Sequence, residues 1–359
     1  MTALLRQISD SPIRVTRAPI RVMLVDDSVV ARSIFARVLG QHDDIEIVCE
    51  AEDSEMALAC LDDHVVDIIL LDIEMPKRSG LDALPDIQAK AKGARILVVS
   101  AFAEENGPAA INALSRGACD TLAKPGRSGF SGRFSEILID KVVRLGRSAR
   151  DHSDAGHAAA LVADERSILP PACIAIGSST GGIPAIYEVV RNLDKAIDCP
   201  IFITQHLPQA FMTFFAKQLA SMTTRTVKVA EQGEPVLANH IYVAPGDAHL
   251  VCRNDGGKVL IDHLQHYSLS RYCPSVDAML ESVTQVYGTR AMGIILSGMG
   301  NDGVYGARLL AAKKGVILVQ DADSSVVWGM PGAIAREGLA TAILDPAQIT
   351  KLLRKIAGR

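Results

Sequence analysis

The chain has 359 residues, of which 48% are hydrophobic and 22% charged, and its formal net charge is −4. This length predicts two domains, and the composition is that of an ordinary globular protein. The negative net charge argues against a surface for nucleic acid or anionic membrane, and no apolar run approaches the ~20 residues that a membrane span needs.

The N-terminal segment and the cysteines bear on the location of the protein. Residues 1–19 carry arginines but no long apolar run, which argues against a secretory signal and predicts a disordered lead-in. The seven cysteines are odd in number, scattered, and mostly placed inside apolar runs. Such cysteines are typical of reduced thiols rather than of a disulfide framework, so the sequence predicts a cytoplasmic protein.

The first half of the chain alternates predicted strands and helices. Apolar runs predict five strands, at residues 20–25, 45–49, 67–72, 95–100 and 119–124. After the first strand, Val30, Ile34 and Val38 recur at four-residue spacing, which predicts a helix. Continuous apolar strands that alternate with helices predict a parallel sheet covered on both faces.

Polar residues stand at the ends of these predicted strands. Asp26 and Asp27 follow the first strand, Asp72 ends the third, Ser100 ends the fourth and Lys124 ends the fifth. Crowded carboxylates repel each other, and Mg²⁺ relieves that repulsion while leaving coordination positions for water and phosphate. A carboxylate near Mg²⁺ is able to attack a phosphoryl group. An Asp-Asp pair alone is usually two solvated acids, but the joint placement of all five residues favours a phosphorylation site.

On these residues, segment 20–140 resembles the receiver domain of two-component response regulators. The resemblance implies a flavodoxin-like fold with a five-stranded parallel sheet. It also implies these roles: phosphoacceptor Asp72, metal ligands Asp26, Asp27 and Asp72, and phosphate-sensing Ser100 and Lys124. Thr121 stands where the family often has an aromatic side chain, so output through an aromatic switch is not expected here.

Residues 141–170 interrupt the alternation of strands and helices. From residue 146 to 157 the chain is small and polar without apolar periodicity, and a pair of prolines closes the segment at 170–171. This composition predicts a linker between a first domain at 20–140 and a second at 171–359. The second stretch again alternates apolar runs with helix-like segments, which predicts a doubly wound, mostly parallel α/β domain.

A serine motif opens the second domain. Gly177 to Gly181 form the pattern G-x-S-x-G directly after an apolar run at 172–176. The glycines permit a tight strand-to-helix turn that exposes the hydroxyl of the central residue, Ser179. The bare pattern is more often a phosphate-binding or structural turn. Hydroxyl-bearing neighbours on both sides compete with Ser179, but only Ser179 centres the pattern.

Two later residues strengthen the case for a nucleophile. His206 ends a predicted strand and Asp302 lies just past another, so both should share a crevice with Ser179 at the carboxyl ends of a parallel sheet. Histidine is suited to take the serine proton, and a buried aspartate orients it. The alternatives are that His206 and Asp302 cap the helices that follow them. The order Ser…His…Asp differs from that of the usual α/β-hydrolases.

Two other groups of residues favour weaker hypotheses. A set of histidines resembles a metal cluster at first glance, at positions 240, 249, 263 and 266, but no cysteine or carboxylate pattern accompanies it. Glycines at positions 298, 300 and 303 are typical of a phosphate cradle, but no lysine follows as a P-loop requires.

Five motifs match one family in order, at residues 176–182, 205–206, 244–250, 274–277 and 297–303. On these motifs the second domain resembles the catalytic domain of chemotaxis protein-glutamate methylesterases. The resemblance implies a catalytic triad of Ser179, His206 and Asp302, and an oxyanion hole formed with amides near Thr180 and Met299. Tyr272 and Cys273 stand where the family often has histidine and arginine.

Together the two resemblances imply a phosphorylation-regulated serine hydrolase. Its substrates would be glutamyl methyl esters, and also glutamines, on methyl-accepting chemoreceptors. A receptor-coupled histidine kinase would be the phosphodonor. Phosphorylation would need Mg²⁺, and the ester hydrolysis would need no cofactor. Two alternatives remain open: a phosphorylation-controlled binding module with a catalytically silent second domain, and a response regulator that acts on DNA, which the acidic charge disfavours.

Overall fold

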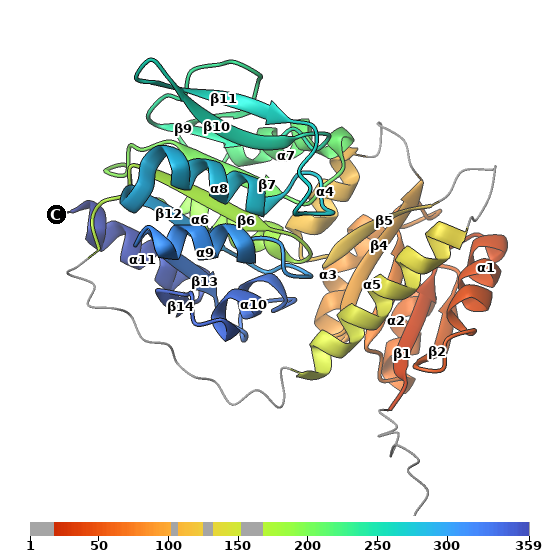
Figure 1. Cartoon of the computed structure of the whole chain (residues 1–359). Helices are drawn as coiled ribbons and strands as arrows, with labels where there is room; N and C mark the ends of the chain where they lie inside the picture. Colours follow the sequence, from red (N-terminus) through yellow and green to blue (C-terminus); the bar gives the residue numbers. More distant parts are fainter. Residues whose placement is uncertain (1–17, 102–106, 125–131, 152–167, 359) are drawn as a thin grey trace, which may run out of the picture.

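The computed structural model describes residues 18–101, 107–124, 132–151 and 168–358, which form two α/β domains packed side by side (Figure 1). The expected lead-in at 1–19 lies almost wholly outside the described residues, as does most of the expected linker. Over the described residues, no helix combines the length and the apolar character that crossing a membrane requires.

The first domain contains a five-stranded parallel sheet in the order β2-β1-β3-β4-β5, as the sequence predicted. The strands are β1 (Ile20–Val25), β2 (Ile45–Ala51), β3 (Ile68–Asp72), β4 (Arg95–Ala101) and β5 (Asp120–Lys124). Every side chain of β3 is buried, because helices cover both faces of the sheet. Strand β5 forms one edge of the sheet.

Five helices cover this sheet, and alternate strand residues face opposite sides. The helices are α1 (Val29–Leu39), α2 (Ser54–Asp63), α3 (Gly80–Lys90), α4 (Gly107–Ser115) and α5 (Gly132–Asp151). Helices α1 and α5 pack with Val22 and Leu24 of β1, whereas α2, α3 and α4 pack with Met23 and Val25. The two-residue period of the strand therefore divides the core into two layers.

Helix α5 extends into the predicted linker. It continues to Asp151, so residues 141–151 of the linker predicted at 141–170 are helical, although the small and polar composition from residue 146 predicted an irregular segment. The prediction failed because part of this segment packs on the sheet: Gly146 is buried, and a Cβ there would clash with Ile20 of β1. Gly146, whose composition context is typical of a linker, therefore permits the close approach of α5 to β1.

One cysteine pair corrects the expectation of reduced thiols. Cys49 on β2 and Cys60 on α2 form a disulfide with an S–S distance of 1.99 Å. The pair escaped sequence analysis because only the packing of α2 against β2 brings the two sulfurs together. The remaining cysteines of the chain are free thiols in the structure: Cys119, Cys173, Cys199, Cys252 and Cys273.

The second domain contains a seven-stranded sheet in the order β14-β13-β12-β6-β7-β9-β8, in which all neighbouring pairs are parallel. Its strands are β6 (Cys173–Ser178), β7 (Ile201–Gln205), β8 (Thr226–Val229), β9 (His240–Val243), β12 (Ala291–Ile295), β13 (Val316–Gln320) and β14 (Ala342–Leu344). A separate antiparallel hairpin joins β10 (His249–Asp255) and β11 (Lys258–Leu264).

Helices cover both faces of the second sheet, which confirms the predicted doubly wound architecture. One face packs with α6 (Gly182–Arg191), α7 (Gln209–Ala220) and α11 (Pro346–Ala357). The other face packs with α8 (Val276–Tyr287), α9 (Val304–Ala312) and α10 (Met330–Arg336). A short 3-10 helix, η3 (Gly288–Arg290), leads into β12, which lies next to the central strand β6.

The two domains share buried apolar contacts. Helix α4 of the first domain packs against α6 and α7 of the second, and Gly107 at the start of α4 lies against the ring of Phe214. Val327 of the second domain belongs to the buried hydrophobic cluster that contains Phe134 and Leu138 of α5. Ser148 Oγ donates a 3.0 Å hydrogen bond to the carbonyl of Val326. The first domain is therefore packed on the second along both sides of β5.

Candidate active site

Three neighbouring strands of the second sheet bring the predicted catalytic residues together. Ser179 follows β6, His206 follows β7, and Asp302 lies in the loop after β12. Strand β6 lies between β12 and β7, so their carboxyl ends meet at one place. Backbone bonds tie these ends, since the His206 amide donates to Ser178 O at 3.1 Å and the Ser179 amide to Ser297 O at 3.0 Å.

The structure separates Ser179 from its neighbour Ser178. Ser178 is fully buried at the end of β6, and its hydroxyl donates to Gln205 Oε1. Ser179 is half-buried and lines a cavity of about 460 Å³ together with His206. No hydrogen bond joins the Ser179 hydroxyl to another residue that the structure describes. Ser179 is thus the serine with an available oxygen.

The turn after Ser179 requires a glycine. Gly181 has a φ of +73°, in the left-handed region that favours glycine, and caps the start of α6. A Cβ at this position would also clash with the side chain of Val326. The glycine pattern in the sequence therefore reflects both backbone geometry and close packing.

His206 is held by a carboxylate and by an aromatic ring. Its Nε2 lies 2.8 Å from Asp302 Oδ2, and its buried Nδ1 has no hydrogen-bond partner among the described residues. The ring of Tyr272 stacks on the imidazole, with centroids 4.7 Å apart and planes inclined by 13°. The hydrogen bond and the stacking contact together fix the plane of the imidazole, and they leave Nδ1 without a described partner.

The carboxylate of Asp302 lies at the N-terminus of α8. Oδ2 accepts the Val276 amide at 2.7 Å, and Oδ1 accepts the Ser275 hydroxyl at 2.8 Å and the Asp277 amide at 3.2 Å. Burial raises the pKa of Asp302, but the bonds from His206, Val276 and Ser275 outweigh it and hold that pKa below its ordinary value. Asp302 therefore remains charged and orients His206.

The alternative capping roles for these two residues do not fit the structure. Helix α9 begins after Gly303 without a side-chain cap, so Asp302 does not cap it. Helix α7 begins after Pro208, also without a side-chain cap. His206 and Asp302 pair with each other instead.

Two backbone amides beside Ser179 have no acceptor among the described residues. They belong to Thr180 and Met299, and both residues line the same cavity as Ser179. Amides of this kind are able to stabilise a negatively charged oxygen that develops during attack on a carbonyl group. The position of these amides is consistent with the oxyanion hole expected from the sequence.

The first domain touches the turn that carries Ser179. The hydroxyl of Thr180 donates a 2.6 Å hydrogen bond to Asp120 Oδ2 at the start of β5, and the Gly181 amide donates to Cys119 O at 2.7 Å. Lys141 of α5 pairs with the same carboxylate oxygen of Asp120. Side chains of α5 also line the 460 Å³ cavity, so the first domain forms one of its walls.

The expected acidic site forms at the carboxyl ends of the first sheet. Carboxylate oxygens of Asp26, Asp27 and Asp72 lie within 4.8 Å of one another. Lys124 Nζ lies 2.7 Å from Asp26 Oδ2 and 2.6 Å from Asp72 Oδ2. Ser100 is buried at the end of the adjacent strand β4. The three oxygen donors suit Mg²⁺.

The surroundings of Asp72 shift its pKa in both directions. Burial raises the pKa of Asp72 to about 6, and the charge of Asp26 adds to that rise, while the bond from Lys124 lowers it. A cation bound by the same carboxylates would favour their ionised forms.

The described residues do not include a metal site formed by the histidines at positions 240, 249, 263 and 266. His249 Nδ1 accepts the Ser275 amide at 3.1 Å, and the ring of His263 contacts the carbonyl of Ala230 at 3.1 Å. Within the described ranges, Asp26, Asp27 and Asp72 are the one group close enough to hold a metal ion.

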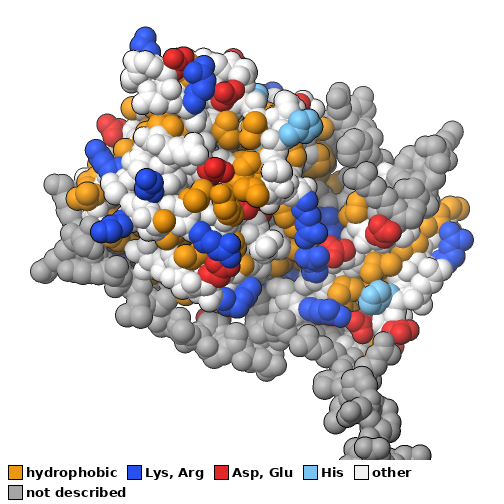
Figure 2. All heavy atoms as spheres, in the orientation of Figure 1, with side chains coloured by type: hydrophobic (Ala, Val, Ile, Leu, Met, Phe, Trp, Pro, Cys, Tyr) orange, Lys and Arg blue, Asp and Glu red, His pale blue; other side chains and the backbone are white. Residues whose placement is uncertain are grey.

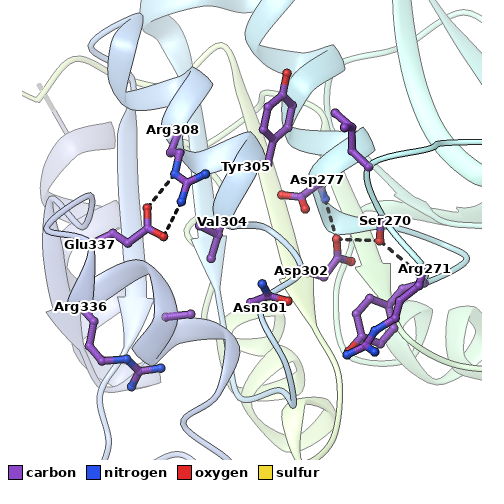
Figure 3. Close-up of a pocket in the computed structure, with 13 residues that line it drawn as sticks. Ser270, Arg271, Asp277, Asn301, Asp302, Val304, Tyr305, Arg308, Arg336 and Glu337 are labelled. Atoms are coloured by element: carbon purple, nitrogen blue, oxygen red, sulfur yellow. Dashed lines mark hydrogen bonds and ion pairs between the residues drawn. The ribbon is translucent and has the colours of Figure 1, made fainter.

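A second cavity, of about 620 Å³, lies on the other side of Asp302 (Figure 3). Asp277 of α8 lines it and accepts the Gly306 amide at 2.8 Å. Burial raises the pKa of Asp277 to about 7, and the nearby charge of Asp302 contributes to the rise. Arg271 and Tyr272 line both this cavity and the one with Ser179.

Sequence analysis missed several of these residues. Asp120 carried no signal, although its neighbour Thr121 was noted. Ser275 and Asp277 belong to the matched motif at 274–277, but nothing in the motif indicated that they surround Asp302. Tyr272 was recognised only as a departure from the family pattern, and its stacking on His206 required the folded loop.

Comparison with known proteins identifies the families of both domains. Residues 174–353 match the family model of the CheB methylesterase, and residues 22–129 match that of the response regulator receiver domain. The protein-glutamate methylesterase/protein-glutamine glutaminase 2 of Caulobacter vibrioides is 40% identical over 341 residues, which cover 92% of this chain and 96% of the relative. The protein-glutamate methylesterase/protein-glutamine glutaminase 1 of Rhodospirillum rubrum is 35% identical and covers 95% and 96% of the two chains.

A solved structure is also similar to the second domain. The Thermotoga maritima CheB methylesterase catalytic domain is 35% identical and covers 51% of this chain and 97% of that chain, with a TM-score of 0.49.

We expect a fluorophosphonate reagent to label Ser179 and no other serine of the second domain. The wild type and Ser178→Ala should be labelled, because both retain the available hydroxyl, whereas Ser179→Ala should not. Mass spectrometry of the labelled peptide identifies the site. Labelling that persists in Ser179→Ala and disappears in Ser178→Ala would move the nucleophile by one residue.

We also expect Asp277 to make stability depend on pH. Its pKa is about 7 in the folded chain against an ordinary value of 3.8. The contribution of its protonated form is therefore complete below pH ~3.8 and is lost as pH rises through ~7. Denaturant unfolding from pH 4 to 8 should show that wild type loses stability relative to Asp277→Asn over this range. A difference that does not vary with pH contradicts the assignment.

Proposed function

Because the chain belongs to the family of CheB methylesterases and carries a response regulator receiver domain, we propose that Ser179, His206 and Asp302 hydrolyse glutamyl methyl esters of chemoreceptors. The chain is a protein-glutamate methylesterase and protein-glutamine glutaminase of chemotaxis signalling, regulated by phosphorylation. The observation that carries the residue assignment is the 2.8 Å hydrogen bond between His206 Nε2 and Asp302 Oδ2, because His206 also lines the cavity that holds the unbonded hydroxyl of Ser179.

The geometry supports a two-step acyl transfer. His206 Nδ1 takes the proton of Ser179 while the serine oxygen attacks the ester carbonyl, and Asp302 stabilises the imidazolium that forms. The amides of Thr180 and Met299 hold the oxyanion. Collapse of this intermediate expels methanol, which receives its proton from His206. A glutamine side chain would lose ammonia in the same step.

Water completes the reaction. His206 takes a proton from a water molecule, which attacks the acyl group on Ser179 and forms a second oxyanion. When that intermediate collapses, the serine oxygen leaves and recovers its proton from His206. The product is a glutamate carboxylate on the receptor, and the enzyme returns to its starting protonation state. The chain's own residues supply every proton-transfer and charge-stabilising group of this scheme.

Regulation begins at the acidic site of the receiver. Asp72 would accept a phosphoryl group from a receptor-coupled histidine kinase in the cytoplasm. Asp26, Asp27 and Asp72 would hold Mg²⁺, which neutralises charge between carboxylates and the phosphoryl group when it is bound. Ser100 at the end of β4 and Lys124 at the end of β5 would contact the phosphoryl oxygens, a role that the 2.6 Å ion pair between Lys124 and Asp72 supports.

Strand β5 offers a direct connection from this site to the esterase. Lys124 at its end pairs with Asp72, and Asp120 at its start bonds Thr180 beside the nucleophile. A phosphoryl group on Asp72 would change the partners of Lys124 and so favour a different position of β5. Loosening of the contact at Asp120 would open the Ser179 cavity to a protein substrate.

The test of the function is release of methanol from receptor-bearing membranes that carry radiolabelled methyl groups. The full chain should release methanol, and acetyl phosphate with Mg²⁺ should increase the rate. Ser179→Ala should release none, because the attacking oxygen is absent. Asp72→Asn should keep the basal rate and lose the stimulation. A full chain that releases no methanol in either condition contradicts the proposed function.

We expect Asp120→Ala to raise the basal rate without phosphodonor, because it removes the bond between β5 and Thr180. Asp140→Ala is the matched control: Asp140 lines the same cavity from α5, but its bond is to Arg144 within that helix. Methanol release by the two variants, measured without acetyl phosphate, separates them. Equal basal rates in both variants and wild type would show that the Asp120 contact does not restrain the enzyme.

A further inference from the structure

The cavity of Figure 3 shares Arg271 and Tyr272 with the catalytic cavity and has Asp302 in its wall, but Ser179 and His206 do not line it. Its walls come from the loop at 269–272, from α8 and α9, and from the end of α10. Arg271 and Tyr272 separate it from the space that holds Ser179 and His206. A protein segment that presents a side chain to Ser179 would therefore pass over this cavity.

The acidic residues of the cavity are already compensated by partners. Glu337 forms two 2.7 Å hydrogen bonds with Arg308. Asp302 accepts bonds from His206 and from the first amides of α8. Asp277 accepts the Gly306 amide, and its carboxyl has a pKa of about 7 because burial and the charge of Asp302 raise it.

Two arginines of the cavity are not compensated in this way. Neither Arg271 nor Arg336 forms an ion pair with any residue in the described part of the chain. Arg271 has a marginal 3.5 Å hydrogen bond to Tyr272 Oη as its described polar contact. Both side chains are exposed, and Figure 3 shows them on opposite sides of the cavity with Asn301 between them.

Aromatic rings hold both arginines in place. The guanidinium of Arg271 lies 5.4 Å from the ring centre of Tyr272, and that of Arg336 lies 5.9 Å from the ring centre of Trp328. Trp328 is fixed in turn by a 2.8 Å hydrogen bond from its indole to Gln320 O. Contact with a ring orients a guanidinium while its N–H edge stays available to bind a carboxylate with two hydrogen bonds.

The surrounding surface carries the same kinds of side chain. Figure 2, in the orientation of Figure 1, shows lysine and arginine side chains at several places on the face that carries α8, α9 and α10, with hydrophobic side chains and a few acidic side chains between them. Such a mixture of apolar area and basic groups suits a protein segment with acidic side chains.

We propose that the cavity between Arg271 and Arg336 binds an acidic segment of the substrate protein next to the glutamyl ester that reacts at Ser179. The proposal rests on the proposed methylesterase function and adds a second contact to it. The reaction itself supplies the chemistry of the ligand, because each hydrolysed ester or deamidated glutamine leaves a carboxylate on the substrate. Those carboxylates would meet the two arginines when a neighbouring ester enters the catalytic cavity.

The first test separates binding of the protein substrate from the chemistry. Arg336→Glu should raise KM for methylated receptor membranes roughly five- to tenfold, because repulsion replaces attraction, and leave kcat nearly unchanged. Hydrolysis of a small ester, 4-nitrophenyl acetate, should be unaffected, because that substrate does not reach Arg336. Arg191→Glu is the matched control, since Arg191 is an exposed arginine on α6 that lies outside both cavities.

The second test identifies the charge that is recognised. Poly-L-glutamate should compete with methylated membranes for the wild type, poly-L-serine of the same length, which is neutral and is not a substrate, should not, and Arg336→Glu should resist both. Arg271→Gln should also raise KM for membranes.

Three results overturn the docking site: an unchanged KM in Arg336→Glu, an equal KM rise in Arg191→Glu, or inhibition by chloride at matched ionic strength as strong as that by poly-L-glutamate. A wild type that hydrolyses neither substrate contradicts the methylesterase function instead.

Discussion

The carboxylate of Asp302 is a charge buried in the protein interior, and the positions of the catalytic residues depend on how that charge is compensated. A buried carboxylate without partners would take up a proton and could no longer orient an imidazolium. Here the first amides of α8, the Ser275 hydroxyl and His206 all bond to it. The N-terminus of a helix thereby fixes the histidine, because the helix fixes the acid to which the histidine is bonded.

The receiver uses the same location in its sheet for a different purpose. Asp26, Asp27 and Asp72 also lie at the carboxyl ends of parallel strands. Asp26 accepts a 2.9 Å hydrogen bond from the amide of Ser28, the N-cap of α1, and Lys124 pairs with both Asp26 and Asp72. A lysine on a flexible stem can exchange a carboxylate for a phosphoryl group, so this arrangement suits a switch, whereas the enclosed Asp302 suits a permanent part of a catalytic site.

The interface between the domains links these two charge arrangements. The edge strand β5 carries Lys124 at one end and Asp120 at the other, and Asp120 bonds the residue next to the nucleophile. In the proposed function, the turn after β6 presents Ser179 to a protein substrate. Packing of β5 and α5 against that turn would restrict access to Ser179, and phosphorylation would act on this contact.

The sequence by itself determined the two alternating α/β domains, the residues at the strand ends and the glycine turn at Ser179, because strand alternation, strand ends and tight turns are local properties that neighbouring residues encode. It also indicated Asp302 and His206, since the end of a buried strand is recognisable without knowing its neighbours. Only the tertiary structure decided that β12, β6 and β7 are adjacent, that Cys49 reaches Cys60, and that α5 continues past Gly146. The contacts of Asp120, Tyr272 and Arg336 likewise join segments far apart in the chain, and packing rather than any local pattern sets such contacts.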